Sequence, residues 1–321
     1  MTDELTIEAT GLTKSYNSVA VVDDIDLAVP RGTVFALLGP NGAGKTTTVR
    51  MLATLTVPDG GRARVAGCDV VTQRPAARRR ISLTGQYAAL DALQTGTENL
   101  WMMGRLRGLT AGEARARSGE LLERFDLVEA GGRRVATYSG GMRRRLDLAA
   151  SLLAAPQVIF LDEPTTGLDP RSRQHMWSLV GELTMAGVTV FLTTQYLDEA
   201  DQLADRIAVL DRGSIVAEGT AAELKATVGG QRLELRCADS AAYDAVELLA
   251  AGRVVRAVPA PLTIAVAYEG GGPGIRTLLD ELDPDRDRIA EFSVRTASLD
   301  DVFMKLTGHT ATDPESEPID D

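Results

Sequence analysis

Short apolar runs recur along the first two thirds of the chain, separated by segments whose apolar residues have helical spacing. The runs at residues 34–38 and 158–161 are uninterrupted, which is typical of strands that a parallel sheet buries on both faces. Residues 188–193 form a similar run, and residues 5–10 and 19–29 predict two strands near the start of the chain. The pattern predicts an α/β fold.

A helical segment interrupts this order between about residues 87 and 150. Thr95 is followed by Glu98, and Thr110 by Glu113, each pair at the spacing of a capping box that begins a helix. Apolar residues at helical spacing follow both boxes. We therefore expect a helical subdomain inserted between strands of the α/β domain.

The pattern changes after residue 228, where the α/β domain (residues 1–228) is expected to end. Residues 229–309 show the order β-α-β-β-α-β and a final helix, which predicts a small ferredoxin-like α+β accessory domain. The glycine-rich run 270–274 lacks a following Lys-Thr and is interpreted as a flexible turn. Residues 310–321 contain acidic and no basic residues, which predicts a disordered tail.

Charge and composition exclude several classes of protein. A formal net charge of -11 opposes binding to nucleic acid or to anionic lipid through charge alone. No apolar run approaches the roughly 20 residues that a membrane span requires, and the acidic start does not resemble a secretion signal. Two cysteines suggest neither a disulfide framework nor a metal site. We expect a chain in the cytoplasm with no membrane span of its own and no nucleic-acid partner.

A phosphate-binding motif follows the first buried run, because residues 39–46 match G-x-x-x-x-G-K-[ST]. A loop of this kind between a strand and a helix binds phosphate through its backbone N–H groups and the helix dipole. Lys45 adds a charge that reaches the β- and γ-phosphates, and the Thr46 hydroxyl is a ligand for Mg²⁺. The predicted nucleotide-binding residues here are Gly39, Pro40, Asn41, Gly42, Ala43, Gly44, Lys45, Thr46 and Thr47.

Two further groups of residues have the chemistry of ATP hydrolysis. Asp162 and Glu163 end a buried strand, where the first carboxylate is expected to hold Mg²⁺ and the second to act as general base toward water. Ser139, Gly140 and Gly141 begin a helix and predict a second anion-binding helix N-terminus. One subunit rarely wraps a single triphosphate with two helix N-termini roughly 95 residues apart.

This spacing resembles the ATP-binding-cassette (ABC) family over residues 5 to about 226. The resemblance implies that ATP and Mg²⁺ are clamped between the phosphate loop of one copy and the Ser-Gly-Gly signature of a second copy. Three residues take a role from the resemblance. It implies that Tyr16 stacks on the base, that Gln86 senses Mg²⁺ and the γ-phosphate as a metal ligand, and that Asp169 communicates across the dimer.

Two positions depart from the family pattern. The signature ends in Met142 where the family usually has Gln, and Gln195 stands where the family has a histidine that contacts the γ-phosphate. The Gln195 amide can donate a hydrogen bond but cannot carry a proton charge, so hydrolysis is expected to be retained but slower. The predicted catalytic residues are Lys45, Gln86, Glu163 and Gln195.

Three arginines, Arg143, Arg144 and Arg145, follow the signature directly. They could steer ATP or an acidic loop of a membrane partner, but a solvated helix face is the favoured interpretation, since charged residues usually occupy the polar face of a helix.

Residues 193–201 and 298–308 resemble a narrower group, the drug-exporting ATP-binding subunits of the daunorubicin-resistance type. The resemblance implies a homodimer bound to a separate integral membrane permease, at the cytoplasmic face of the cell membrane, that exports an amphiphilic drug or antibiotic. In this group glutamine is the usual residue at position 195. The alternative is a regulatory ABC ATPase that takes no part in transport and hydrolyses ATP slowly because of Gln195.

Overall fold

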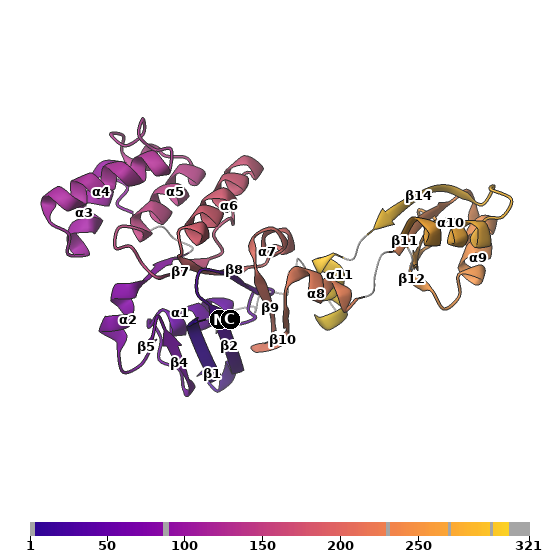
Figure 1. Cartoon of the computed structure of the whole chain (residues 1–321), viewed down its shortest axis with the longest axis horizontal. Helices are drawn as coiled ribbons and strands as arrows, with labels where there is room; N and C mark the ends of the chain where they lie inside the picture. The colour runs from indigo at the N-terminus through magenta and orange to yellow at the C-terminus, as the bar shows by residue number, and fades with distance from the viewer. Residues whose placement is uncertain (1–3, 86–89, 229–231, 269–270, 296–297, 308–321) are drawn as a thin grey trace, which may run out of the picture. The chain divides into compact units, whose positions relative to one another are not determined.

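The computed structural model describes residues 4–85, 90–228, 232–268, 271–295 and 298–307 (Figure 1). Contacts divide the chain into one unit that reaches Ala221 and a second that runs from Ala222 to Thr310. The predicted domain limit at residue 228 lies a few residues further along the chain. The predicted tail, from residue 310 on, lies outside the described residues.

A four-stranded antiparallel sheet begins the first unit. Its strand order is β2-β1-β4-β5. β1 continues past residue 10, where the first strand was predicted to end, because register shifts around Gly11 disturb the alternation without ending the strand. The bounds are β1 Leu5–Tyr16, β2 Val19–Pro30, β4 Gly60–Val65 and β5 Cys68–Asp69.

A six-stranded sheet forms the centre of this unit, in the order β10-β9-β3-β8-β7-β6. Neighbouring strands are parallel except for the pair β9 and β10. Every residue of β3, β7 and β8 is buried, as their apolar runs predict. β10 was not predicted, because its buried and exposed residues do not alternate regularly. The bounds are β3 Val34–Leu38, β6 Ile81–Thr84, β7 Val158–Asp162, β8 Thr189–Thr194, β9 Arg206–Asp211 and β10 Ser214–Gly219.

Helices lie on both sides of this sheet. Figure 1 shows α3, α4, α5 and α6 together on one side of β7 and β8, with α1 on the other side. Both predicted capping boxes are present, at Thr95 and at Thr110. Within the described residues, no helix combines the length and the apolar character needed to cross a bilayer. The bounds are α1 Lys45–Leu52, α2 Arg74–Arg80, α3 Gly96–Leu106, α4 Ala111–Arg124, η1 Val135–Thr137, α5 Gly140–Ser151, α6 Pro170–Met185 and α7 Leu197–Leu203. The next helix, α8 Ala221–Ala226, begins at the limit between the two units.

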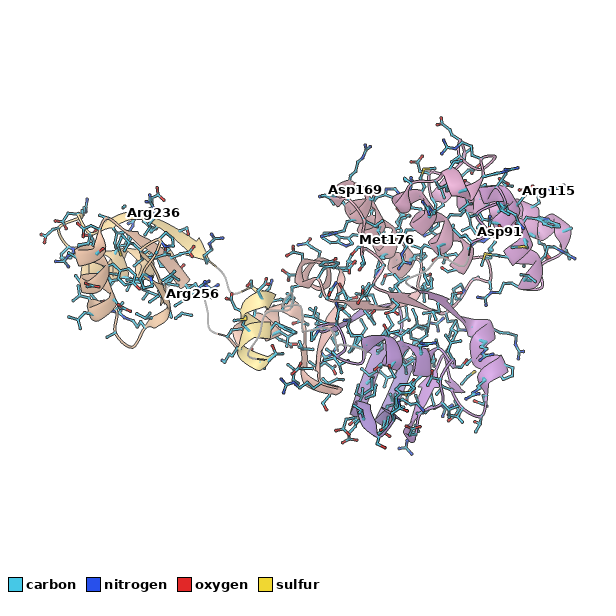
Figure 2. The ribbon with its side chains drawn as sticks, turned by 180° about the vertical axis from the view of Figure 1, so that it is seen from behind. Asp91, Arg115, Asp169, Met176, Arg236 and Arg256 are labelled. Carbon is cyan, nitrogen blue, oxygen red and sulfur yellow. The ribbon has the colours of Figure 1, made fainter. Side chains whose placement is uncertain are left out.

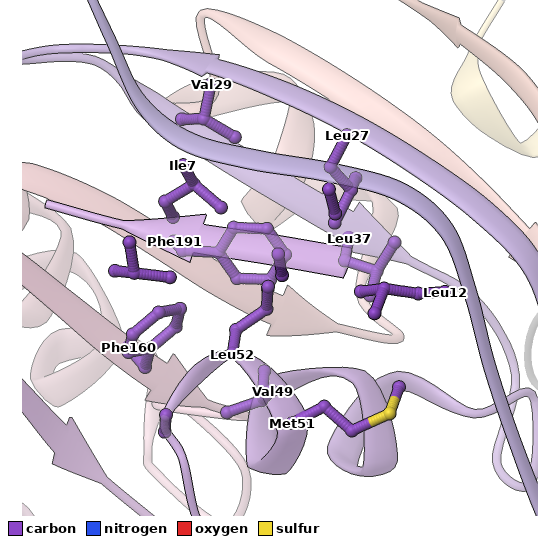
Figure 3. Packing of buried hydrophobic residues seen from close by; sticks show 14 of the residues in the cluster. Ile7, Leu12, Leu27, Val29, Leu37, Val49, Met51, Leu52, Phe160 and Phe191 are labelled. Atoms are coloured by element: carbon purple, nitrogen blue, oxygen red, sulfur yellow. The ribbon is translucent and has the colours of Figure 1, made fainter. Parts of the chain in front are cut away.

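The core of the first unit lies between the two sheets and α1. Figure 3 shows side chains from β1, β2, β3 and α1 packed around Phe160 and Phe191. Phe191 stacks on Phe35 with ring centroids 5.3 Å apart and meets Phe160 at 5.7 Å. These aromatic contacts help to hold β3, β7 and β8 in place relative to one another. The positions of the polar residues at the ends of these strands are set by that arrangement.

The second unit has the predicted β-α-β-β-α-β order and a final helix. Its sheet is antiparallel in the order β12-β13-β11-β14, which is the ferredoxin-like arrangement. The flexible turn predicted for the glycine run is wrong, because α10 already begins at Gly271 and tolerates Pro273 in its first turn. The bounds are β11 Arg232–Cys237, α9 Ser240–Leu249, β12 Val254–Val258, β13 Thr263–Ala267, α10 Gly271–Leu282, β14 Ile289–Arg295 and α11 Leu299–Thr307.

Candidate active site

The loop between β3 and α1 requires glycine at two positions. A Cβ on Gly39 would lie 2.4 Å from the carbonyl oxygen of Leu210. A Cβ on Gly44 would lie 2.5 Å from the carbonyl oxygen of Val21, and its φ of +106° is a conformation that other residues rarely adopt. The loop is therefore packed closely against β2 and β9, while Asn41 at its tip is exposed.

The Lys45 side chain folds back over this loop. Its Nζ donates hydrogen bonds of 2.9 Å to the carbonyl oxygens of Gly39 and Pro40 and lies 3.5 Å from Oε1 of Glu163. Burial lowers the pKa of Lys45, while the negative charges of Glu163 and Asp162 raise it. The ammonium group therefore sits where the phosphate loop meets the end of β7.

Asp162 accepts hydrogen bonds from two hydroxyl groups at the end of β7. Its Oδ1 accepts from Thr193 Oγ1 at 2.6 Å and from Thr46 Oγ1 at 3.2 Å. Hydroxyl and carboxylate oxygens suit Mg²⁺, so the chemistry of Thr46 and Asp162 fits the metal that the sequence predicts. Gln86, the third predicted ligand, lies outside the described residues.

Few acidic or metal-binding side chains gather at this position. In the described part of the chain, no group of three His, Cys, Asp or Glu side chains could hold a metal ion. Mg²⁺ in nucleotide sites usually binds one or two protein groups and completes its shell with water and phosphate oxygens. Thr46 and Asp162 are two protein groups of this kind, and their oxygens lie 3.2 Å apart.

Glu163 has a backbone conformation that few residues adopt. Its φ of +49° lies in the left-handed region, which costs about 1–3 kcal/mol and persists only when surrounding contacts enforce it. The Glu163 N–H donates at 3.1 Å to both the carbonyl oxygen and Oγ1 of Thr193, and Thr166 Oγ1 donates to its Oε2 at 3.3 Å. Neither threonine was predicted as a site residue, because hydroxyl groups at strand ends and turns are common.

The predicted signature begins α5. Ser139 is the N-cap, and its Oγ accepts a hydrogen bond of 3.2 Å from the N–H of Met142. A Cβ on Gly141 would lie 2.6 Å from Ser172 Oγ, so glycine allows α5 to approach α6. Ser139 and Gly140 are exposed. The helix therefore presents an open N-terminus to an outside ligand.

One copy of the chain does not join the two predicted anion sites. Among the described residues, no hydrogen bond or ion pair links residues 139–141 to the phosphate loop. Figure 1 shows α5 and α1 on opposite sides of β7 and β8. Glu163 nevertheless lines a cleft that Gly140 and Arg143 also line.

Asp169 is the N-cap of α6, and Figure 2 places it at the beginning of that helix. Its Oδ1 accepts from the N–H of Ser172 at 2.9 Å and its Oδ2 from the Ser172 hydroxyl at 2.6 Å. These hydrogen bonds lower the pKa of Asp169. Within one copy, Asp169 therefore stabilises the start of α6, and its role across a dimer stays a prediction.

Gln195 directly follows β8, which lies between β3 and β7 in the sheet. The N–H of Gly39 donates to the carbonyl oxygen of Thr194 at 3.2 Å, so the phosphate loop begins beside this strand end. Because the strands are parallel, Gln195 lies at the same edge as Lys45 and Asp162.

Tyr16 is the last residue of β1, whereas the predicted strands 5–10 and 19–29 would have left it in the loop between them. The residue is 46% exposed, and Lys14 Nζ lies 5.4 Å from the centroid of its ring. The hairpin of β1 and β2 continues to Val21, where the chain meets Gly44 of the phosphate loop. An exposed aromatic face therefore lies on the hairpin that borders the loop.

The interpretation of the three arginines as a solvated helix face is wrong for two of them. Arg144 is 9% exposed, and Arg145 is half-buried and donates to the carbonyl oxygen of Phe125 at 3.0 Å. Only Arg143 is exposed. A run of three like charges carries no periodicity, so the sequence could not indicate which arginine faces inward.

A glycine loop with Lys45 and Thr46 after a buried parallel strand, beside two acidic residues at the end of β7, defines a P-loop nucleotide hydrolase.

Comparisons with known proteins give the family within this class. Residues 22–166 match the family described as ABC transporter. The chain is 53% identical over 314 residues to the daunorubicin/doxorubicin resistance ATP-binding protein DrrA of Streptomyces peucetius. The aligned residues make up 97% of this chain and 95% of that protein. It is 34% identical over 310 residues to the linearmycin resistance ATP-binding protein LnrL of Bacillus subtilis, covering 96% and 100%.

A solved structure of the ATP-binding subunit of an ABC transporter covers 70% of this chain and 93% of that chain, with a TM-score of 0.63 and 28% identity. The chain therefore belongs to the ATP-binding proteins of ABC transporters, in the group that includes DrrA, and it is an ABC ATPase.

Proposed function

We propose that two copies of this chain clamp MgATP between them and that its hydrolysis drives a separate membrane permease to export an amphiphilic drug. The convergence of Lys45, Thr46, Asp162 and Glu163 supports the proposal, because these groups have the chemistry of one half of a hydrolytic site. Among the described residues, no hydrogen bond or ion pair joins the helix N-terminus at Ser139 to the phosphate loop of the same copy. A second copy would supply that N-terminus to complete the site.

Each group at the site has a specific task. The loop N–H groups and Lys45 bind the β- and γ-phosphates, and Thr46 and Asp162 hold Mg²⁺, which neutralises charge on the phosphate oxygens when bound. Glu163 accepts the proton of the attacking water. Gln195 donates a hydrogen bond from its amide to the γ-phosphate.

Three assignments extend the site beyond these contacts. Tyr16 is exposed on the hairpin beside the loop and would stack on the base. Gln86 would bind Mg²⁺, and Asp169 would contact the second copy from its position at the start of α6. Each assignment is supported by the family to which the chain belongs.

The cargo is proposed from the relatives. DrrA and LnrL are named for resistance to daunorubicin or doxorubicin and to linearmycin. We propose an amphiphilic antibiotic of this kind as the cargo, with the ATPase held at the cytoplasmic face of the membrane by its permease.

Two experiments test the proposal. Purified chain carrying Glu163→Gln should bind MgATP and lose steady-state hydrolysis by about 10²-fold or more, since the general base is absent. Unchanged hydrolysis would contradict the role of Glu163. In wild-type chain, single-turnover release of phosphate supports the exporter, whereas ATP binding without release supports the regulatory alternative.

The transport step is tested in cells that express the chain together with a candidate permease, an integral membrane protein that we expect the neighbouring reading frame to encode. Survival in doxorubicin should increase with the wild-type chain and not with Lys45→Ala. Equal survival with both chains would contradict the proposed transport function.

A further inference from the structure

Arg144 connects helix α5 to the ends of two strands in the central sheet. Its guanidinium group donates three hydrogen bonds, each to a backbone carbonyl oxygen. Nε donates to Pro164 at 2.9 Å, Nη1 to Gly85 at 2.5 Å and Nη2 to Asp162 at 3.2 Å.

The surroundings of Arg144 compensate for burying its charge. Burial lowers the pKa of Arg144, and the carboxylates of Asp147, Asp162 and Glu199 raise it. Asp147 forms an ion pair with Arg144, in which its Oδ2 lies 3.7 Å from Nη1. An arginine side chain stays protonated in proteins, so the buried group is a cation held by three carbonyl oxygens and neighbouring acids.

The three carbonyl groups belong to segments that matter for hydrolysis. Asp162 and Pro164 are the residues on either side of Glu163, and Gly85 directly precedes Gln86 in the sequence. Arg144 itself lies in the second turn of the helix that Ser139 caps. One planar group with fixed donor directions therefore fixes the position of the signature helix relative to the catalytic turn.

We propose that Arg144 is a positioning residue for ATP hydrolysis, which holds the Ser139 end of α5 in register with the turn that carries Glu163. This inference rests on the proposed clamp between two copies. Without Arg144, each copy would still bind nucleotide at its own phosphate loop. The signature of one copy and the base of the other could then no longer be brought to one triphosphate together.

The test compares Arg144→Lys and Arg144→Met with Arg79→Met, which removes an exposed arginine from α2. Both Arg144 variants should lower kcat at least about tenfold, with ATP affinity of the isolated copy within about twofold of wild type. Lysine keeps the charge but lacks the planar guanidinium group, so kcat of Arg144→Lys should lie between that of Arg144→Met and that of wild type. Arg79→Met should keep both values.

Wild-type kcat in Arg144→Lys would overturn the inference, and so would an equal loss of kcat and ATP affinity. If Arg144→Met does not fold, Arg144→Lys alone decides. Dimerisation of the double variant Glu163→Gln with Arg144→Lys, compared with Glu163→Gln alone, distinguishes a failure of this inference from a failure of the proposed clamp. No MgATP-dependent dimer with Glu163→Gln alone means that the clamp is wrong. A dimer of unchanged affinity in Glu163→Gln with Arg144→Lys means that only the role of Arg144 is wrong.

Discussion

Thr193 Oγ1 donates a 2.6 Å hydrogen bond to Asp162 Oδ1. Thr193 Oγ1 also accepts a hydrogen bond of 3.1 Å from the N–H of Glu163. One hydroxyl group therefore holds the carboxylate expected to bind the metal and the backbone of the residue expected to act as base.

Replacing this hydroxyl should impair hydrolysis more than folding. Thr193→Val keeps the side-chain shape but removes the hydrogen bond to Asp162 Oδ1 and one of the two acceptors of the Glu163 N–H. The substitution should lower kcat by about 10- to 100-fold and the free energy of unfolding by about 1–3 kcal/mol. Steady-state ATPase assays and urea denaturation measure the two effects. Thr184→Val, at a hydroxyl that bonds only within α6, is the control. Equal kcat in the two variants would show that the Thr193 hydroxyl has no role in hydrolysis.

Gly44 should not tolerate a side chain. Gly44→Ala would combine a positive φ with a Cβ 2.5 Å from the carbonyl oxygen of Val21, so ATP affinity should fall by at least about tenfold as the loop shifts. Gly187→Ala is the matched control, because Gly187 also has a positive φ but no atom within 4 Å of the added Cβ. The control should lose about 1–2 kcal/mol of stability and keep its ATP affinity. Fluorescent-nucleotide titration decides, and equal affinities would refute the packing argument.

Gln195 gives the site an uncharged hydrogen-bond donor. Gln195→Ala should lower kcat by about tenfold, whereas Gln195→His should keep a donor and make kcat depend on pH. The introduced imidazole is charged below a pKa near 6.5, so kcat relative to wild type should be higher at about pH 6 than at pH 8. Parallel pH–rate profiles for wild type and Gln195→His would contradict a contact with the γ-phosphate.

Asp283 should stabilise the second unit in a pH-dependent way. Burial opposes its ionisation, but the N–H groups of Asp287, Arg288 and Ile289 donate to its carboxylate at 3.0, 3.1 and 2.9 Å and lower the pKa of Asp283 overall. Because the folded pKa is below the unfolded value, this stabilisation is complete above about pH 4 and is lost as the pH falls through the folded pKa.

Asp283→Ala should therefore destabilise the second unit by about 1–3 kcal/mol at neutral pH. Hydrogen exchange in β11 measures this loss within the full chain. Asp285→Ala, which removes an exposed carboxylate nearby, is the control. Equal protection of β11 in the two variants would show that the Asp283 contacts do not stabilise this unit.

The sequence predicted the parts of the fold that local pattern determines. Apolar runs indicated β3, β7 and β8 because strands buried on both faces need apolar residues throughout. Capping boxes indicated the starts of α3 and α4 because the box itself makes the cap. The motifs at the ends of β3 and β7 then indicated Lys45 and Asp162 as residues of one nucleotide site.

Contacts between distant segments were not predictable in this way. The inward orientation of Arg144 depends on how α5 packs on the sheet, and the link from Thr193 to Asp162 depends on the register of β7 with β8. The helix start at Gly271 was missed because glycine and proline usually mark turns, although both are tolerated in a first helical turn.

The most direct test of the clamp mixes two inactive variants. Lys45→Ala keeps a complete signature, and Ser139→Arg keeps a complete phosphate loop. If each triphosphate is bound between two copies, a mixed pair contains one complete site, and single-turnover hydrolysis should reappear on mixing. If the mixture stays as inactive as each variant alone while both variants remain folded and pair with one another, the triphosphate is not clamped between Lys45 of one copy and Ser139 of the other.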